Sequence, residues 1–130
     1  MKLVRQKTRH DCGVAVAAML CEKEYACAAK ARCRLGNRGM TLYDWVSTLE
    51  RMKQPVDLWM FERKARLTKK INSLPDQCAV LIGDDYENLH WICVCDKRIY
   101  DPELKNTRNI NSYASRNWKV YGYARLKNDN

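Results

Sequence analysis

Histidine is scarce in this sequence: His10 and His90 are the only two among 130 residues. Few side chains are therefore available as a catalytic base or as a nitrogen ligand for a metal. Long apolar runs are missing as well, because the longest one, residues 13–21, is far too short to span a bilayer. No cleavage site of small residues marks a secretory signal. We therefore expect no membrane association, and a protein that acts in a reducing cytoplasm.

Cysteine, in contrast, is abundant, with seven residues. Without an export signal we expect free thiols rather than disulfides, and most of them as small core residues. A structural zinc site needs two close pairs of ligands. That pattern is missing from the spacing Cys21, Cys27, Cys33 and Cys93-Val94-Cys95. We predict no metal and no cofactor, while a cysteine-rich metal protein remains a third hypothesis, which stoichiometric zinc in the purified protein would reveal.

The length of 130 residues is typical of one domain, residues 1–130. The net charge of +9 suggests an acidic partner, nucleic acid, or solubility alone. No nucleic-acid motif is present and aromatic residues do not alternate with the basic ones, so nucleic acid could bind the basic faces but is not expected to. The basic clusters comprise Lys2, Arg5, Lys7 and Arg9; Lys30, Arg32, Arg34 and Arg38; and Arg63, Lys64, Arg66, Lys69 and Lys70.

The first half of the chain has the pattern of helices. Asp11 is a good N-cap, and residues 13–20 are apolar on every side, which is typical of a buried central helix. Residues 22–34 are rich in alanine and predict a second helix. Thr41 opens a third, and Asp44 completes a capping box with it.

The second half has the pattern of strands. Short β-branched and aromatic runs are separated by Gly, Pro, Asn and Asp, which favours an antiparallel sheet. The predicted strands are 56–61, 78–82, 90–95, 98–100 and 118–126, and residues 67–73 predict a short helix or a loop. Helices followed by strands indicate an α+β fold, with the central N-terminal helix packed on the sheet.

Cys12 lies where a polar, basic segment meets the apolar helix. A thiol at the N-terminus of a helix lies in the positive end of the helix dipole, which favours the thiolate. Two interpretations compete at this point: Cys12 is a small core residue, or it is a nucleophile. A nucleophile also needs a base, and His10 precedes the N-cap and is expected to point away from the helix.

His90 is the better base, because it begins a predicted strand–turn–strand unit that ends at Asp101. A turn near residues 95–96 would bring Asp101 opposite His90, where a carboxylate can orient the imidazole. A turn at residues 97–98 would instead offset the two, and the sequence leaves this register open. Asn88 or Asp85 would be the next partners to consider.

An acidic segment, Asp84, Asp85 and Glu87, precedes His90. We expect these residues to form a solvated turn, although they could favour basic substrates.

These motifs resemble those of the C39 peptidases, a family of papain-like cysteine peptidases whose best-known members remove leader peptides after a double glycine. The resemblance extends over about residues 6–102. The residues that carry it are Gln6, Asp11-Cys12-Gly13, His90 and Asp101-Pro102.

The resemblance implies a papain-like fold and a role for each matching residue. Cys12 would be the nucleophile, His90 its general base and Asp101 the residue that orients His90. Gln6 would donate its side-chain amide to the oxyanion, and Gly13 would leave room for the substrate backbone. The expected activity is hydrolysis of a peptide or isopeptide bond in a peptide or protein substrate, through an acyl-thioenzyme. The alternative is a basic binding module that holds nucleic acid or an acidic protein without hydrolysis.

Overall fold

A computed structural model describes residues 1–33, 39–84, 88–113 and 118–127. It shows an α+β fold in which helices come first and most strands follow, as the sequence predicts. The elements are α1 (Cys12–Cys21), α2 (Tyr25–Ala31), α3 (Leu42–Arg51), β1 (Val56–Arg66), α4 (Leu67–Lys70), η1 (Ile71–Ser73), β2 (Cys78–Gly83), β3 (Leu89–Cys95), β4 (Arg98–Tyr100), β5 (Arg108–Asn109), α5 (Ile110–Tyr113) and β6 (Lys119–Leu126).

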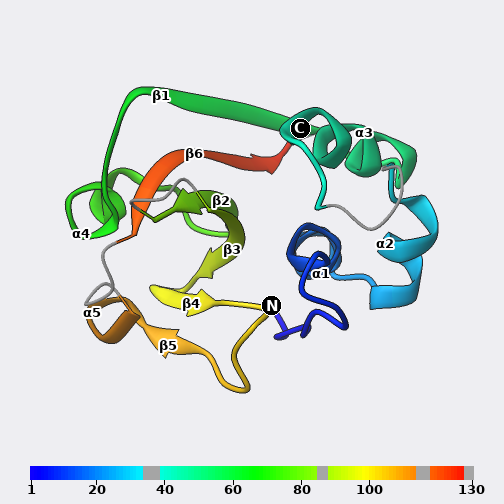
Figure 1. Cartoon of the computed structure of the whole chain (residues 1–130), viewed down its shortest axis with the longest axis horizontal. Coiled ribbons are helices and arrows are strands. Elements are labelled where there is room, and N and C mark those ends of the chain that lie inside the picture. The colour runs from blue at the N-terminus through cyan, green and yellow to red at the C-terminus, as the bar shows by residue number, and fades with distance from the viewer. Residues whose placement is uncertain (34–38, 85–87, 114–117, 128–130) are drawn as a thin grey trace.

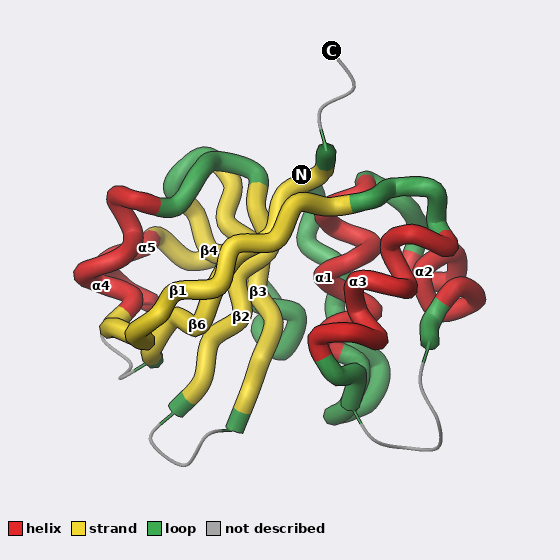
Figure 2. Tube along the Cα trace, turned by 90° about the horizontal axis from the view of Figure 1, so that it is seen from above, coloured by secondary structure: helices red, strands yellow, loops and turns green. Residues whose placement is uncertain are grey.

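The strands form one open sheet in the order β1-β6-β2-β3-β4-β5, and every neighbouring pair is antiparallel. Figure 1 shows the sheet curving from β1 at the top to β5 at the bottom, with α1 beside its middle strands. In Figure 2, helices α1, α2 and α3 lie on one side of the sheet and α4 and α5 on the other. The predicted antiparallel sheet is confirmed.

Helix α1 is the centre of the fold. Every residue after Cys12 in this helix is buried, which confirms the prediction made from its uniformly apolar sequence. It packs on β3, and Trp45 of α3 stacks on Trp91 of β3 with ring centroids 4.2 Å apart. A second apolar cluster, which includes Ile92 and Ile99, fills the space under α4 and α5.

Some boundaries differ from the predicted ones. Helix α2 is shorter than residues 22–34, because Glu22 takes a left-handed conformation that ends α1 and Glu24 is extended. Arg34, at the end of that predicted range, lies outside the described residues. Strand β1 runs past residue 61 to Arg66, because it resumes pairing with β6 after an irregularity. The capping box of Thr41 and Asp44 at the start of α3 is confirmed.

All seven cysteines lie in the described ranges and are unbridged, as expected. Four of them are buried in the core: Cys21, Cys78, Cys93 and Cys95. Of the helices in those ranges, none combines the length and the apolar character needed to cross a bilayer.

Candidate active site

The structure brings His90 and Asp101 together. His90 is the second residue of β3, and Asp101 directly follows β4. The Nε2 atom of His90 lies 2.7 Å from Oδ1 of Asp101, and the two side chains are only 9% and 1% exposed. The sequence predicted this pair, and the contact places the Asp101 carboxylate where it can orient the imidazole ring.

The register of the β3–β4 hairpin differs from both alternatives. The pairs Cys95↔Arg98 and Val94↔Ile99 leave a two-residue turn at Asp96 and Lys97, one residue later than the turn at 95–96. Both turn residues have positive φ, 53° and 60°, as a tight hairpin turn requires. Asp101 is therefore not directly opposite His90 in the ladder. It reaches the ring because the chain leaves the sheet after β4.

Asp101 is held by further donors. Its Oδ1 also accepts the backbone N–H of Glu103 at 2.9 Å, and its Oδ2 accepts the hydroxyl of Tyr113 at 2.7 Å. Burial alone would raise the pKa of this carboxyl. The hydrogen bond and charge of His90, together with the hydrogen bonds from Glu103 and Tyr113, lower the pKa by more than burial raises it, so the net pKa is below its usual value. The carboxylate is ionised at neutral pH.

His90 is strongly biased toward its charged form. Burial lowers the pKa of the ring, but hydrogen bonding and charge from Asp101 and from the Cys12 side chain raise it to about 10. Since Nε2 is engaged by Asp101, Nδ1 is the nitrogen left for the thiol. The ring of Trp118 is stacked near that of His90, with the two ring centroids 6.2 Å apart. An imidazolium between a thiol and a carboxylate can hold a thiolate and later donate a proton.

Cys12 is the first residue of α1 and is half-buried. The predicted N-cap is wrong in one respect: the Asp11 side chain makes no capping bond. It accepts a hydrogen bond from the hydroxyl of Tyr25 instead, and Asp11 is almost fully buried. No residue in the described ranges accepts the backbone N–H of Cys12. This N–H is therefore available to a developing oxyanion.

Gln6 lies against the segment that follows Asp101, because its backbone N–H donates to the carbonyl of Pro102 at 3.0 Å. Its side-chain Nε2 donates to the carbonyl of Thr8 at 2.9 Å. A primary amide has two N–H groups, and among the described residues no hydrogen bond joins this side chain to Cys12 or His90. Within the described part of the chain, the buried Oε1 has no donor.

Gly13 has a packing role that the sequence analysis did not predict, while its predicted role of leaving room for a substrate stays a prediction. A Cβ atom here would lie 2.8 Å from Cε of Met40 and 3.2 Å from the Trp45 ring. The carbonyl of Gly13 also accepts the indole N–H of Trp45 at 3.1 Å. The glycine thus allows α3 and its preceding loop to pack closely on the start of α1.

A cavity of about 280 Å³ lies beside Cys12. The sequence analysis did not identify it, because its walls come from four separate segments. The apolar side chains that line it are Met40, Leu42, Leu81, Leu89 and Trp91, and Arg9 and His10 lie at the same cavity. Leu89, which directly precedes His90, is 56% exposed. The cavity can accept an apolar side chain next to the thiol.

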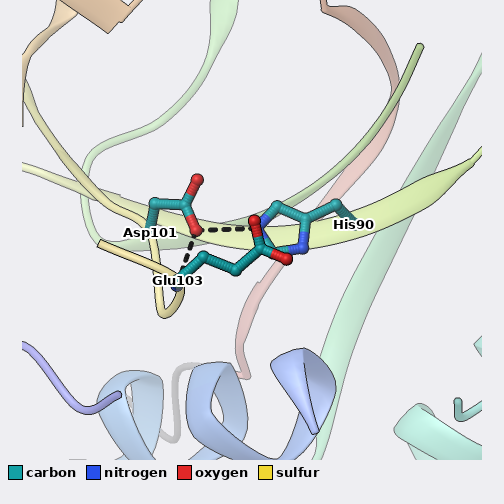
Figure 3. A group of neighbouring side chains, drawn as sticks. All are labelled: His90, Asp101 and Glu103. Atoms are coloured by element: carbon teal, nitrogen blue, oxygen red, sulfur yellow. Dashed lines mark hydrogen bonds and ion pairs between the residues drawn. The ribbon is translucent and has the colours of Figure 1, made fainter. Parts of the chain in front are cut away.

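A group of three side chains, His90, Asp101 and Glu103, has the chemistry of metal ligands (Figure 3). Their ligand atoms lie within 4.8 Å of one another. Both oxygens of Asp101 already have donors, however, and a metal would have to displace the bond from His90. We therefore assign these residues to a hydrogen-bonded network and not to a metal centre.

The predicted acidic turn before His90 is described in part. Asp84 accepts hydrogen bonds from the backbone and the side chain of Asn88, at 3.0 Å each. Asn88, named above as another partner of His90, is engaged there. Asp85 and Glu87 lie outside the described residues.

No model of a known protein family matches this chain, and no curated protein matches it either. What the structure shows is an α+β fold with an open antiparallel sheet and a buried His–Asp pair beside a half-buried thiol. The resemblance to the C39 peptidases remains a prediction from the sequence motifs.

Proposed function

We propose that this protein is a papain-like thiol hydrolase of the C39 type, which cleaves a peptide or isopeptide bond. The observation that carries the proposal is the charge network of His90, which interacts with Asp101 on one side and with Cys12 on the other. Such a network is what a cysteine nucleophile requires. Seven free thiols fit a reducing cytoplasm, where we propose that the protein acts.

The proposed reaction has two stages. The Cys12 thiolate attacks the substrate carbonyl, and the N–H of Cys12 and the amide of Gln6 stabilise the oxyanion. His90 donates its proton to the leaving amine, which departs as the C–N bond breaks and leaves a thioester on Cys12. His90 then removes a proton from water, which attacks the thioester. The acid product leaves, and the thiolate–imidazolium pair is restored.

The cavity beside Cys12 suggests the chemistry of the substrate. Its walls are mainly apolar, and burying an aliphatic or aromatic side chain there is favourable by about 1.5–3 kcal/mol. We therefore propose a peptide or protein substrate with an apolar residue close to the scissile bond.

Cleavage of a peptide library, read by mass spectrometry of the new termini, tests the proposal. The wild-type protein should produce new termini and Cys12→Ala should produce none. Cys27→Ala is the matched control, because Cys27 is exposed on α2 and should leave cleavage unchanged. His90→Ala should lose as much activity as Cys12→Ala, because the two act as a unit. Cleavage that persists in Cys12→Ala, or no cleavage by the folded wild type, contradicts the proposal.

A basic binding module remains the second candidate, and one feature of the sheet favours it. On β1 and β6, Trp59 and Phe61 flank Tyr123, with ring centroids 5.3 and 5.9 Å from it. The side chains of Arg125 and Lys70 lie over the rings of Trp59 and Phe61. The fold thus places cations beside aromatic rings that are not adjacent in the sequence, an arrangement that suits single-stranded nucleic acid.

Salt-dependent binding of a labelled single-stranded RNA would support this second function if Trp59→Ala weakened it and Cys12→Ala did not. Failure to bind at low salt would rule it out.

A further inference from the structure

Tyr113 donates its hydroxyl to the carboxylate oxygen of Asp101 that His90 does not use. The bond to Oδ2 is 2.7 Å long, whereas the bond between His90 and Oδ1 lies on the other side of the carboxylate. Tyr113 is 3% exposed and Asp101 1%. A buried carboxylate between two donors of this kind has little freedom to rotate.

Tyr113 is the last residue of α5, which directly follows the edge strand β5. β4 and β5 pair through Arg98↔Asn109, which directs the chain into α5. The side chain of Asn109 accepts the backbone N–H of Ser112 at 2.7 Å and so stabilises this short helix. The Tyr113 ring belongs to the apolar cluster that contains Ile99. The ring is therefore held by packing, and its hydroxyl is directed by that packing toward Asp101.

We propose that Tyr113 is a positioning residue of the active site, which fixes the Asp101 carboxylate so that Oδ1 stays aligned with Nε2 of His90. The inference rests on the proposed thiol hydrolase function. Without the hydroxyl, the buried anionic Oδ2 lacks its donor, and the carboxylate is expected to rotate out of its alignment with His90. His90 then loses alignment, and the Cys12 thiolate is held less well.

The test measures the rate at which iodoacetamide alkylates Cys12 at a series of pH values between 5 and 9. Mass spectrometry follows the alkylation, and the rates give a pH profile. Tyr113→Phe keeps the ring and removes only the hydroxyl. It should slow alkylation near pH 7 about tenfold, the effect of one hydrogen bond of roughly 1.4 kcal/mol. Tyr43→Phe is the matched control, because Tyr43 is 80% exposed, and it should leave the rate unchanged.

A double-mutant cycle separates positioning from a general structural role. If Tyr113 acts through Asp101, then Tyr113→Phe should have no further effect in an Asp101→Asn background. Additive slowing, or a wild-type rate and pH profile in Tyr113→Phe, would overturn the inference while the proposed function stands. If instead Cys12 of the wild type reacts no faster than in His90→Ala, the proposed function itself fails.

Should Tyr113→Phe not fold, the wild-type protein provides the measurement. The hydroxyl proton of Tyr113, buried and bonded to a carboxylate, should exchange slowly with water and give an NMR signal that Asp101→Asn shifts. A hydroxyl proton in fast exchange with water would refute the bond on which the inference depends.

Discussion

The charge of His90 can be measured directly, and the proposed reaction depends on it, because the charged ring holds the thiolate of Cys12 and donates a proton. A pKa of about 10, against an ordinary value of about 6.5, corresponds to about 5 kcal/mol in favour of the charged ring in the folded protein. Asp101→Asn removes the negative charge and keeps the shape of the side chain. Burial continues to lower the pKa of His90 in this variant, so that pKa should fall by about 1 to 3.

The same network makes stability depend on pH. The folded-state pKa of His90 lies above the unfolded value, so its stabilisation is complete below about pH 6.5 and is lost as the pH rises toward about 10. The free energy of unfolding of the wild type should therefore fall between about pH 7 and 10, by at most about 5 kcal/mol. Asp101→Asn should show a clearly smaller fall. Urea denaturation at a series of pH values gives both curves.

NMR of the histidine rings gives the pKa itself. The variant His10→Gln leaves one histidine in the chain, so that the signal of His90 is assigned without ambiguity. Long-range ¹H–¹⁵N spectra then follow both ring nitrogens during titration. A His90 ring that titrates near or below about 6.5, or one that Asp101→Asn leaves unchanged, would refute the charge network described above.

Three further outcomes are expected. Brief iodoacetamide treatment should label Cys12 before the four buried thiols and before the exposed Cys27. Faster labelling of Cys27 would contradict the proposed role of Cys12 as the nucleophile. Gln6→Ala should lower kcat about 100-fold. It should lower the free energy of unfolding by no more than the bond to the Thr8 carbonyl contributes, about 0.5–1.5 kcal/mol, whereas a loss of stability as large as the loss of activity would make Gln6 structural. Gly122→Ala should destabilise the fold by about 1–3 kcal/mol in thermal unfolding, because its Cβ would lie 2.5 Å from a β1 carbonyl oxygen. Gly39→Ala, with its nearest contact at 3.9 Å, is the control and should be close to neutral.

The pairing of His90 with Asp101 could be predicted because few residues compete for these roles. With two histidines in the chain, and one of them before the N-cap, the base was limited to His90. The position of the turn could not be predicted, because Asp96 and Lys97 are not the glycine or asparagine that usually mark positive φ. The pair survives a shift of one residue because Asp101 lies just beyond the strand.

Tyr113 and the cavity were missed for a different reason. Tyr113 follows a polar segment without periodicity, and its place depends on a β4–β5 ladder of two residue pairs, which is too short to leave a pattern. The cavity walls come from segments far apart in the chain, so their proximity depends on tertiary packing. Asp11 shows the same limit over a shorter separation. Its position predicts a capping hydrogen bond to the helix, but its carboxylate accepts the hydroxyl of Tyr25, fourteen residues away, instead.

The bond between the Gln6 N–H and the Pro102 carbonyl joins segments 96 residues apart. Cys12 is made before His90 and Asp101, and it meets them only after the β3–β4 hairpin has been made and has packed on α1. Under the proposed function, Cys12 of a nascent or misfolded copy is an ordinary thiol that cannot cleave neighbouring proteins. The reactivity of Cys12 should therefore appear late during refolding, together with the final tertiary contacts. Alkylation at timed intervals would then report when these contacts have formed.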